Sequence, residues 1–365
     1  MRWRAAAGAL GAAVLVGAVL VLREQVPPPT PRPPAPTSAQ ALTIADPGLP
    51  ARDPQRAPRW RLNSVPRGAV DGVAGPQHLV YTRASEDQME LTVRRSDTGE
   101  QLVSHAVPNE DAPWSSLLHD GLLLVAHGRQ QVRLDVIDPA TGEVREFEPP
   151  AGYSFRPRLV DLGDEVLLLG WHTDPRQSCV LAVQPRTGAT RVAWCAEQSM
   201  VPAWLYAGVD EVVWPAVGPS GCLQWQRLQP GGQAQPVPPT ATLCGARALI
   251  NLAGWQVAQH PERDALQPMI VASDGSRQLA LGTAAGFVGC GRHVYWSAAT
   301  QGIDPDTVYR WLPGADYREV AYRLELSDRL ALAAPRCTDG VLSVAVTTAH
   351  GGDPRLVELL SLGRP

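Results

Sequence analysis

The sequence contains no lysine, so all 32 basic residues are arginine, and it has only three phenylalanines and four methionines. The formal net charge is −4 over 365 residues. Proteins that bind nucleic acid neutralise its phosphates with an excess of basic side chains, so we expect no nucleic-acid partner. The sequence also lacks Gly-x-Ser-x-Gly, P-loop, dinucleotide-binding and His-Glu-x-x-His motifs. The common sequence signatures of nucleotide-binding proteins, serine hydrolases and zinc proteases are therefore absent.

The amino terminus contains an uncharged apolar run, Ala5–Leu22. At about 1.5 Å per residue, a helix of this length nearly spans the hydrocarbon core of a bilayer. A cleaved signal peptide is the alternative, but the first Ala-x-Ala, Ala39–Ala41, lies far downstream of the run. We predict an uncleaved signal anchor at 5–22 after a cytoplasmic stub at 1–4. The arginines in that stub favour an inside amino terminus, so the bulk of the chain is expected to be periplasmic or extracellular.

A proline-rich segment follows, and seven of the ten residues in Pro27–Pro36 are proline. Proline favours extended polyproline II and prevents a packed core. We interpret residues 23–58 as a semi-rigid linker between the membrane and a folded domain at 59–365.

The folded domain consists of short apolar runs and tight turns that recur about every 44 residues. The clearest unit is Gly121–Pro149, in which the expected strands Val132–Ile137 and Val144–Glu148 flank the turn Asp138–Gly142. Because both the apolar runs and the turns have this period, the sequence predicts radially repeated four-stranded antiparallel blades, an all-β propeller.

A period near 44 divides residues 59–365 into seven units, of which the last lacks its fourth strand after Leu356–Leu362. Trp60–Val65, directly upstream of the first unit, has the length of the missing strand. We therefore expect this amino-terminal strand to complete the seventh blade and to close the ring without a free sheet edge.

Individual blades resemble known repeat families. The turns Asp138–Glu143 and Asp97–Glu100 are similar to those of PQQ-like propellers, and His293–Ser297 followed by Val308–Arg310 resembles a YWTD-type blade. The resemblance implies a propeller fold over residues 59–365.

The six cysteines lie beyond the predicted anchor, and no Cys-x-x-Cys is present, so disulfides in an oxidising compartment are expected rather than a zinc site. Cys179 and Cys195 flank a tight turn almost symmetrically and are predicted to pair across neighbouring strands. The other expected pairs are Cys222 with Cys244, and Cys290 with Cys337.

One face of the ring collects both the second-to-third connections within blades and the connections from one blade to the next. Histidines follow several second strands on this face, and aromatic residues and arginines follow the inter-blade connections, a combination typical of binding surfaces. A His-rich metal or acid–base site is the alternative, but the blades concerned are spread around the ring. We predict an interaction face and no catalytic residue, metal ligand or cofactor; the residues of this face are Trp114, Tyr153, Phe155, Arg156, His127, His172, Arg176, His260, His350 and Arg355.

The preferred functional hypothesis is a membrane-tethered, extracytoplasmic interaction or scaffold module for a protein or an envelope polymer. A propeller hydrolase or lactonase with a channel-centred site is the alternative, and a PQQ-type oxidoreductase is less favoured. Histidines and carboxylates that converge on the ring axis would favour the hydrolase.

Overall fold

The computed structural model describes residues 48–108, 114–128, 131–172, 177–196, 205–208, 210–217, 223–238, 246–260, 268–284, 286–300, 304–325, 329–348 and 355–363. The predicted anchor at 5–22 lies outside the described residues. Within the part that is described, no helix is long and apolar enough to cross a membrane.

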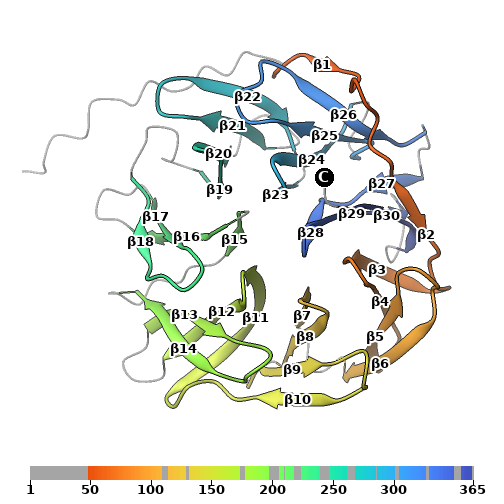
Figure 1. Ribbon diagram of the computed structural model, residues 1–365, viewed down its shortest axis with the longest axis vertical. Helices are drawn as coiled ribbons and strands as arrows, with labels where there is room; N and C mark the ends of the chain where they lie inside the picture. The colour runs from red at the N-terminus through yellow and green to blue at the C-terminus, as the bar shows by residue number, and fades with distance from the viewer. Residues whose placement is uncertain are drawn as a thin grey trace, which may run out of the picture. The chain divides into compact units, whose positions relative to one another are not determined.

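Seven mainly antiparallel sheets follow one another along the part of the chain that the structure describes, as the sequence predicted (Figure 1). The first five contain four strands each. Blade 1 comprises β3 (Ala69–Ala74), β4 (His78–Ala84), β5 (Gln88–Arg95) and β6 (Gln101–Pro108). Blade 2 comprises β7 (Trp114–His119), β8 (Leu122–His127), β9 (Arg133–Ile137) and β10 (Val144–Phe147). Blade 3 comprises β11 (Tyr153–Leu162), β12 (Glu165–His172), β13 (Gln177–Val183) and β14 (Thr190–Cys195). Blade 4 comprises β15 (Tyr206–Ala207), β16 (Val212–Val217), β17 (Leu223–Leu228) and β18 (Gln235–Pro236).

The remaining three blades include the two strands nearest the amino terminus. Blade 5 comprises β19 (Ala248–Leu252), β20 (Trp255–His260), β21 (Met269–Ser273) and β22 (Gln278–Thr283). Blade 6 comprises β23 (Gly286–Cys290), β24 (His293–Ala298), β25 (Thr307–Trp311), β26 (Arg318–Arg323) and β1 (Ala51–Arg52). Blade 7 comprises β27 (Leu330–Leu332), β28 (Arg336–Thr338), β29 (Val341–Thr348), β30 (Leu356–Leu362) and β2 (Arg61–Asn63).

The hydrophobic core of the propeller is a set of layers, one between each pair of neighbouring blades. Strand β8 shows why its sequence is apolar throughout. Successive side chains of a strand point to opposite faces, so Leu123 and Val125 pack against blade 1, whereas Leu122 and Leu124 pack against blade 3. A strand between two other sheets has no solvent-facing side, which is why the second strands appear as continuous apolar runs.

The amino-terminal strand completes the last blade, which confirms the predicted closure. Strand β2 pairs antiparallel with β30, and Leu62 lies opposite Leu360. Asn63, which is 5% exposed, donates from Nδ2 to the Leu359 carbonyl oxygen and to Ser361 Oγ, both at 3.0 Å. Residues from the two ends of the domain are thus hydrogen-bonded within one sheet.

Part of the segment assigned to the linker by sequence also belongs to the propeller. Strand β1 pairs parallel with β26, where Ala51 lies opposite Arg318. The Leu49 amide donates to the Ala280 carbonyl oxygen at 2.8 Å. The backbone of this stretch has hydrogen-bond partners on two blades, which the surrounding proline-rich composition did not indicate.

Two of the three predicted disulfides are confirmed. Cys179 and Cys195 lie directly opposite each other on β13 and β14, with Cα atoms 4.0 Å apart. The bridge between Cys290 on β23 and Cys337 on β28 joins blades 6 and 7. Cys222 and Cys244 lie outside the described residues.

We predict that Asn63→Ala lowers the free energy of unfolding by about 1–3 kcal/mol, because it removes two buried hydrogen bonds and leaves their acceptors unsatisfied. Urea denaturation measures the change. The matched control is Leu62→Ala on the same strand, which is expected to shift stability by less than about 0.5 kcal/mol because Leu62 is 61% exposed. Equal midpoints for Asn63→Ala and the unmodified protein would contradict a stabilising role for this contact.

Candidate functional site

Three residues of the predicted interaction face lie at one end of blade 3, in two ring contacts on opposite faces of its sheet. Tyr153 begins β11 and lies opposite His172 at the end of β12, with their ring centroids 4.6 Å apart. The Arg156 guanidinium lies 5.5 Å from the ring centroid of Trp171, next to His172 in sequence. Arg156 is exposed and the three rings are half-buried. We call Tyr153, Arg156, Trp171 and His172 the blade 3 cluster.

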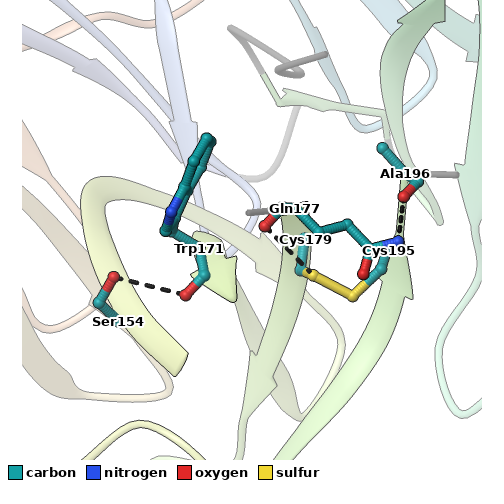
Figure 2. The surroundings of a disulfide bond; sticks show 6 residues. All are labelled: Ser154, Trp171, Gln177, Cys179, Cys195 and Ala196. Carbon is teal, nitrogen blue, oxygen red and sulfur yellow. Dashed lines mark hydrogen bonds between the residues drawn. A yellow bond between two sulfur atoms is a disulfide. The ribbon is translucent and has the colours of Figure 1, made fainter. Parts of the chain in front are cut away.

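The strands beneath the blade 3 cluster are fixed by backbone pairing and by the first disulfide (Figure 2). Ser154 Oγ donates to the Trp171 carbonyl oxygen at 3.5 Å. On the neighbouring strand Gln177 lies opposite His172, and its side chain donates to the Ala196 carbonyl oxygen just after Cys195. All four strands of the blade are therefore linked at the end that carries the cluster.

The other residues of the predicted face do not join this cluster. Phe155 is 2% exposed and packs in the layer between blades 2 and 3. His127 is buried against Asp135 within blade 2. His260 ends β20 in blade 5, and Arg355 precedes β30 in blade 7. Arg176, His350 and the side chain of Trp114 lie outside the described residues.

A cavity of about 530 Å³ lies among the innermost strands of the propeller. Strands β3, β7, β11, β23 and β28 all contribute to its walls. The walls are charged: Arg336 on β28 forms an ion pair with Asp71 on β3 at 2.8 Å, and Arg158 and Asp161 come from β11. Burial lowers the pKa of Arg158. The walls of the cavity thus carry charged side chains among apolar ones.

A histidine and two carboxylates converge beside this cavity from three different blades. His119 ends β7, Asp161 lies near the end of β11, and Asp339 lies in the turn between β28 and β29. His119 Nδ1 is 2.8 Å from Asp161 Oδ1. One ligand atom from each residue lies within 4.8 Å of the others, so the group has the geometry to hold a cation. We call these three residues the channel cluster.

The acidic partners control the protonation of the channel cluster. Burial by itself lowers the pKa of His119, but the hydrogen bond to Asp161 and the charges of the nearby carboxylates raise it above its ordinary value. Burial, together with the charge of Asp161, raises the pKa of Asp339. A buried imidazole between acidic groups favours a bound positive charge, either a proton or a metal ion.

The sequence did not predict the channel cluster, because the predicted interaction face lies at the opposite ends of the strands. A usable signal was present in two Asp-Gly pairs, Asp120-Gly121 and Asp339-Gly340. Asp-Gly is typical of two-residue hairpin turns, and both aspartates have positive φ values, 47° and 49°. These pairs locate the turns at the ends of β7 and β28, but they do not show that the two turns meet.

We predict that the protonation of His119 stabilises the fold at low and neutral pH. The pKa of His119 is raised in the folded state. Its contribution to the unfolding free energy is therefore fully present below about pH 6.5, the pKa of histidine in the unfolded chain, and is lost as the pH rises through the folded-state pKa. In urea denaturation above pH 6.5, the unfolding free energy of His119→Gln is expected to fall less with rising pH than that of the unmodified protein.

The matched control for His119→Gln is His293→Gln. Burial lowers the pKa of His293 to about 4, so its contribution changes only between about pH 4 and 6.5. An equal decline above pH 6.5 in the unmodified protein and in His119→Gln would contradict the stabilising role of the His119–Asp161 contact.

Comparison with known proteins identifies only the fold. No family model and no curated protein sequence matches this chain. A similar solved structure is oligogalacturonate lyase in complex with manganese, with a TM-score of 0.52 and 14% identity over 79% of this chain and 86% of that chain. The β-propeller domain of the trilobed protease from Pyrococcus furiosus matches with a TM-score of 0.51 and 11% identity over 79% and 96%. Acylaminoacyl peptidase from Pyrococcus horikoshii matches with a TM-score of 0.51 and 9% identity over 81% of this chain but only 52% of its own. This chain is therefore similar to known β-propellers in fold.

Proposed function

We propose that this chain is a membrane-tethered, extracytoplasmic β-propeller that binds a protein or an envelope polymer. The blade 3 cluster is the observation that carries the proposal, because it places half-buried aromatic rings and an exposed arginine at one end of the same sheet. Aromatic residues and arginine are enriched among the side chains that dominate binding energy.

The position of the blade 3 cluster on paired strands also supports a binding role. Its residues lie on paired strands rather than on a long loop, and Cys179–Cys195 joins the outer two strands of the same blade. A surface that is already ordered loses little conformational entropy on binding, so more of the contact energy appears as affinity. The predicted anchor and linker fit this role, since they would hold the propeller near the membrane and clear of it.

The test is crosslinking in cells that carry the full-length, membrane-anchored protein, followed by purification and identification of what is attached. We expect a reproducible partner whose recovery falls at least tenfold in Tyr153→Ala/Arg156→Ala, because truncating a hot-spot side chain costs about 2 kcal/mol or more.

The matched control is Arg52→Ala/Tyr317→Ala, which removes another arginine–tyrosine pair, in blade 6, where the guanidinium lies 4.5 Å from the ring centroid. This control is expected to retain the partner. Equal losses in the two double variants would reject the blade 3 cluster as the binding surface. The interaction-module proposal fails if no partner is recovered reproducibly while the protein turns over a small substrate.

A hydrolase or lactonase that works from the channel is the second candidate. The channel cluster favours it, since a histidine and carboxylates beside the axial cavity are the arrangement that such an activity requires. Imidazole and carboxylate ligands suit divalent cations, and a cation-bound water is a nucleophile near neutral pH. One protein of similar fold was solved in complex with manganese, although at 14% identity the likeness concerns the fold alone.

The second candidate predicts turnover of esters or lactones by the purified protein in the presence of a divalent cation. Asp161→Asn is expected to reduce that turnover at least a hundredfold, because it removes a charged ligand beside the cavity. Asp53→Asn, an exposed acidic residue ahead of the first blade, serves as the control. No turnover across a broad substrate panel, with zinc and manganese each supplied, would reject this candidate.

A further inference from the structure

A second group of metal-type ligands lies between blades 1 and 2, separate from the channel cluster. His105 is on β6, the fourth strand of blade 1, whereas His127 and Asp135 are on β8 and β9 of blade 2. His127 Nε2 lies 3.0 Å and His105 Nε2 lies 3.1 Å from the same carboxylate oxygen, Asp135 Oδ2. Two imidazoles from different blades thus approach one oxygen atom.

The surroundings of this group are apolar. Val107 on β6, Val125 on β8 and Ile137 on β9 belong to the hydrophobic layer between the two blades. Asp135 is 8% exposed and His127 is 6% exposed. A buried carboxylate is unfavourable unless positive charge or hydrogen bonds compensate it. The neighbouring residues of the layer are valine and isoleucine, which cannot pair with polar groups. The three polar side chains therefore require a compensating interaction of another kind.

Hydrogen bonding among the three residues does not use all of their polar atoms. His105 Nε2 is buried and has no hydrogen-bond partner of good geometry, even though Asp135 Oδ2 is within 3.1 Å. A nitrogen and an oxygen this close, with no well-aligned hydrogen bond between them, are suitably placed to be ligands of one metal ion. Ligand atoms about 2.1 Å from a tetrahedral ion are about 3.4 Å apart, close to the separations observed.

We propose that His105, His127 and Asp135 bind a divalent transition-metal ion, zinc or a metal of similar preference, that joins blade 1 to blade 2. Two imidazole nitrogens and one carboxylate oxygen are a ligand set typical of these metals, whereas calcium and magnesium prefer oxygen ligands throughout. The ion would neutralise the buried carboxylate and link β6 to β8 and β9. This site does not depend on the function proposed above.

The test uses the full-length protein in detergent, stripped with a chelator and titrated with Zn²⁺ by calorimetry and with Co²⁺ by visible absorption. We expect Zn²⁺ to raise the melting temperature by several degrees, because an ion that binds only the folded state stabilises it. Co²⁺ is expected to give an absorption band that Zn²⁺ removes.

The variants His105→Gln, His127→Gln and Asp135→Asn are each expected to weaken Zn²⁺ binding at least tenfold, whereas His293→Gln is expected to retain it. Each measurement is repeated in a His119→Gln background, so that ions held by the channel cluster do not contribute. Should His127→Gln not fold, the more exposed His105→Gln still tests the site. Absence of Zn²⁺ binding in the stripped protein, or undiminished binding in His105→Gln and Asp135→Asn, would overturn the proposal and leave the three residues as a hydrogen-bonded contact.

Discussion

Apolar packing between neighbouring blades is the interaction on which the rest of this structure depends. Each sheet has two faces, and in a ring both faces are covered by neighbouring sheets. Leu123 and Leu124 are adjacent in sequence, yet they pack in two different inter-blade layers. Removing any blade would expose apolar layers on both of its sides, which makes closure of the ring a condition for burying the core.

Closure depends on contacts between the ends of the domain. Strand β2 contributes the fourth strand position of blade 7, and Asn63 hydrogen-bonds to Leu359 and Ser361 far away in sequence. The Cys290–Cys337 bridge strengthens the neighbouring interface between blades 6 and 7. The ring is therefore held by backbone pairing at one blade and by a covalent bond at the adjacent interface.

The polar groups that interrupt these layers are where function is expected, because burying them is unfavourable without a partner. The His105–His127–Asp135 group places imidazole and carboxylate within a layer otherwise built from valine, leucine and isoleucine. The channel cluster lies beside the central cavity instead. The blade 3 cluster differs from them, since it lies at the accessible end of its sheet. The molecule thus has one aromatic–arginine cluster at the end of a sheet and two inner groups suited to cations.

The sequence by itself determined the blade repeat, the strand that closes the ring and the pairing of Cys179 with Cys195. These features follow from local periods and from turns such as Asp138–Gly142, which act over a few residues.

Only the tertiary structure decided which polar residues meet. His119 and Asp339 are far apart in the chain and come together because β7 and β28 both line the channel. His127, expected at the surface, lies in a buried layer because its side chain shares the strand face of Val125, which packs against blade 1. The alternation of residues along a strand specifies which face of the sheet each side chain occupies. Which residue of another blade it contacts depends on how the ring closes.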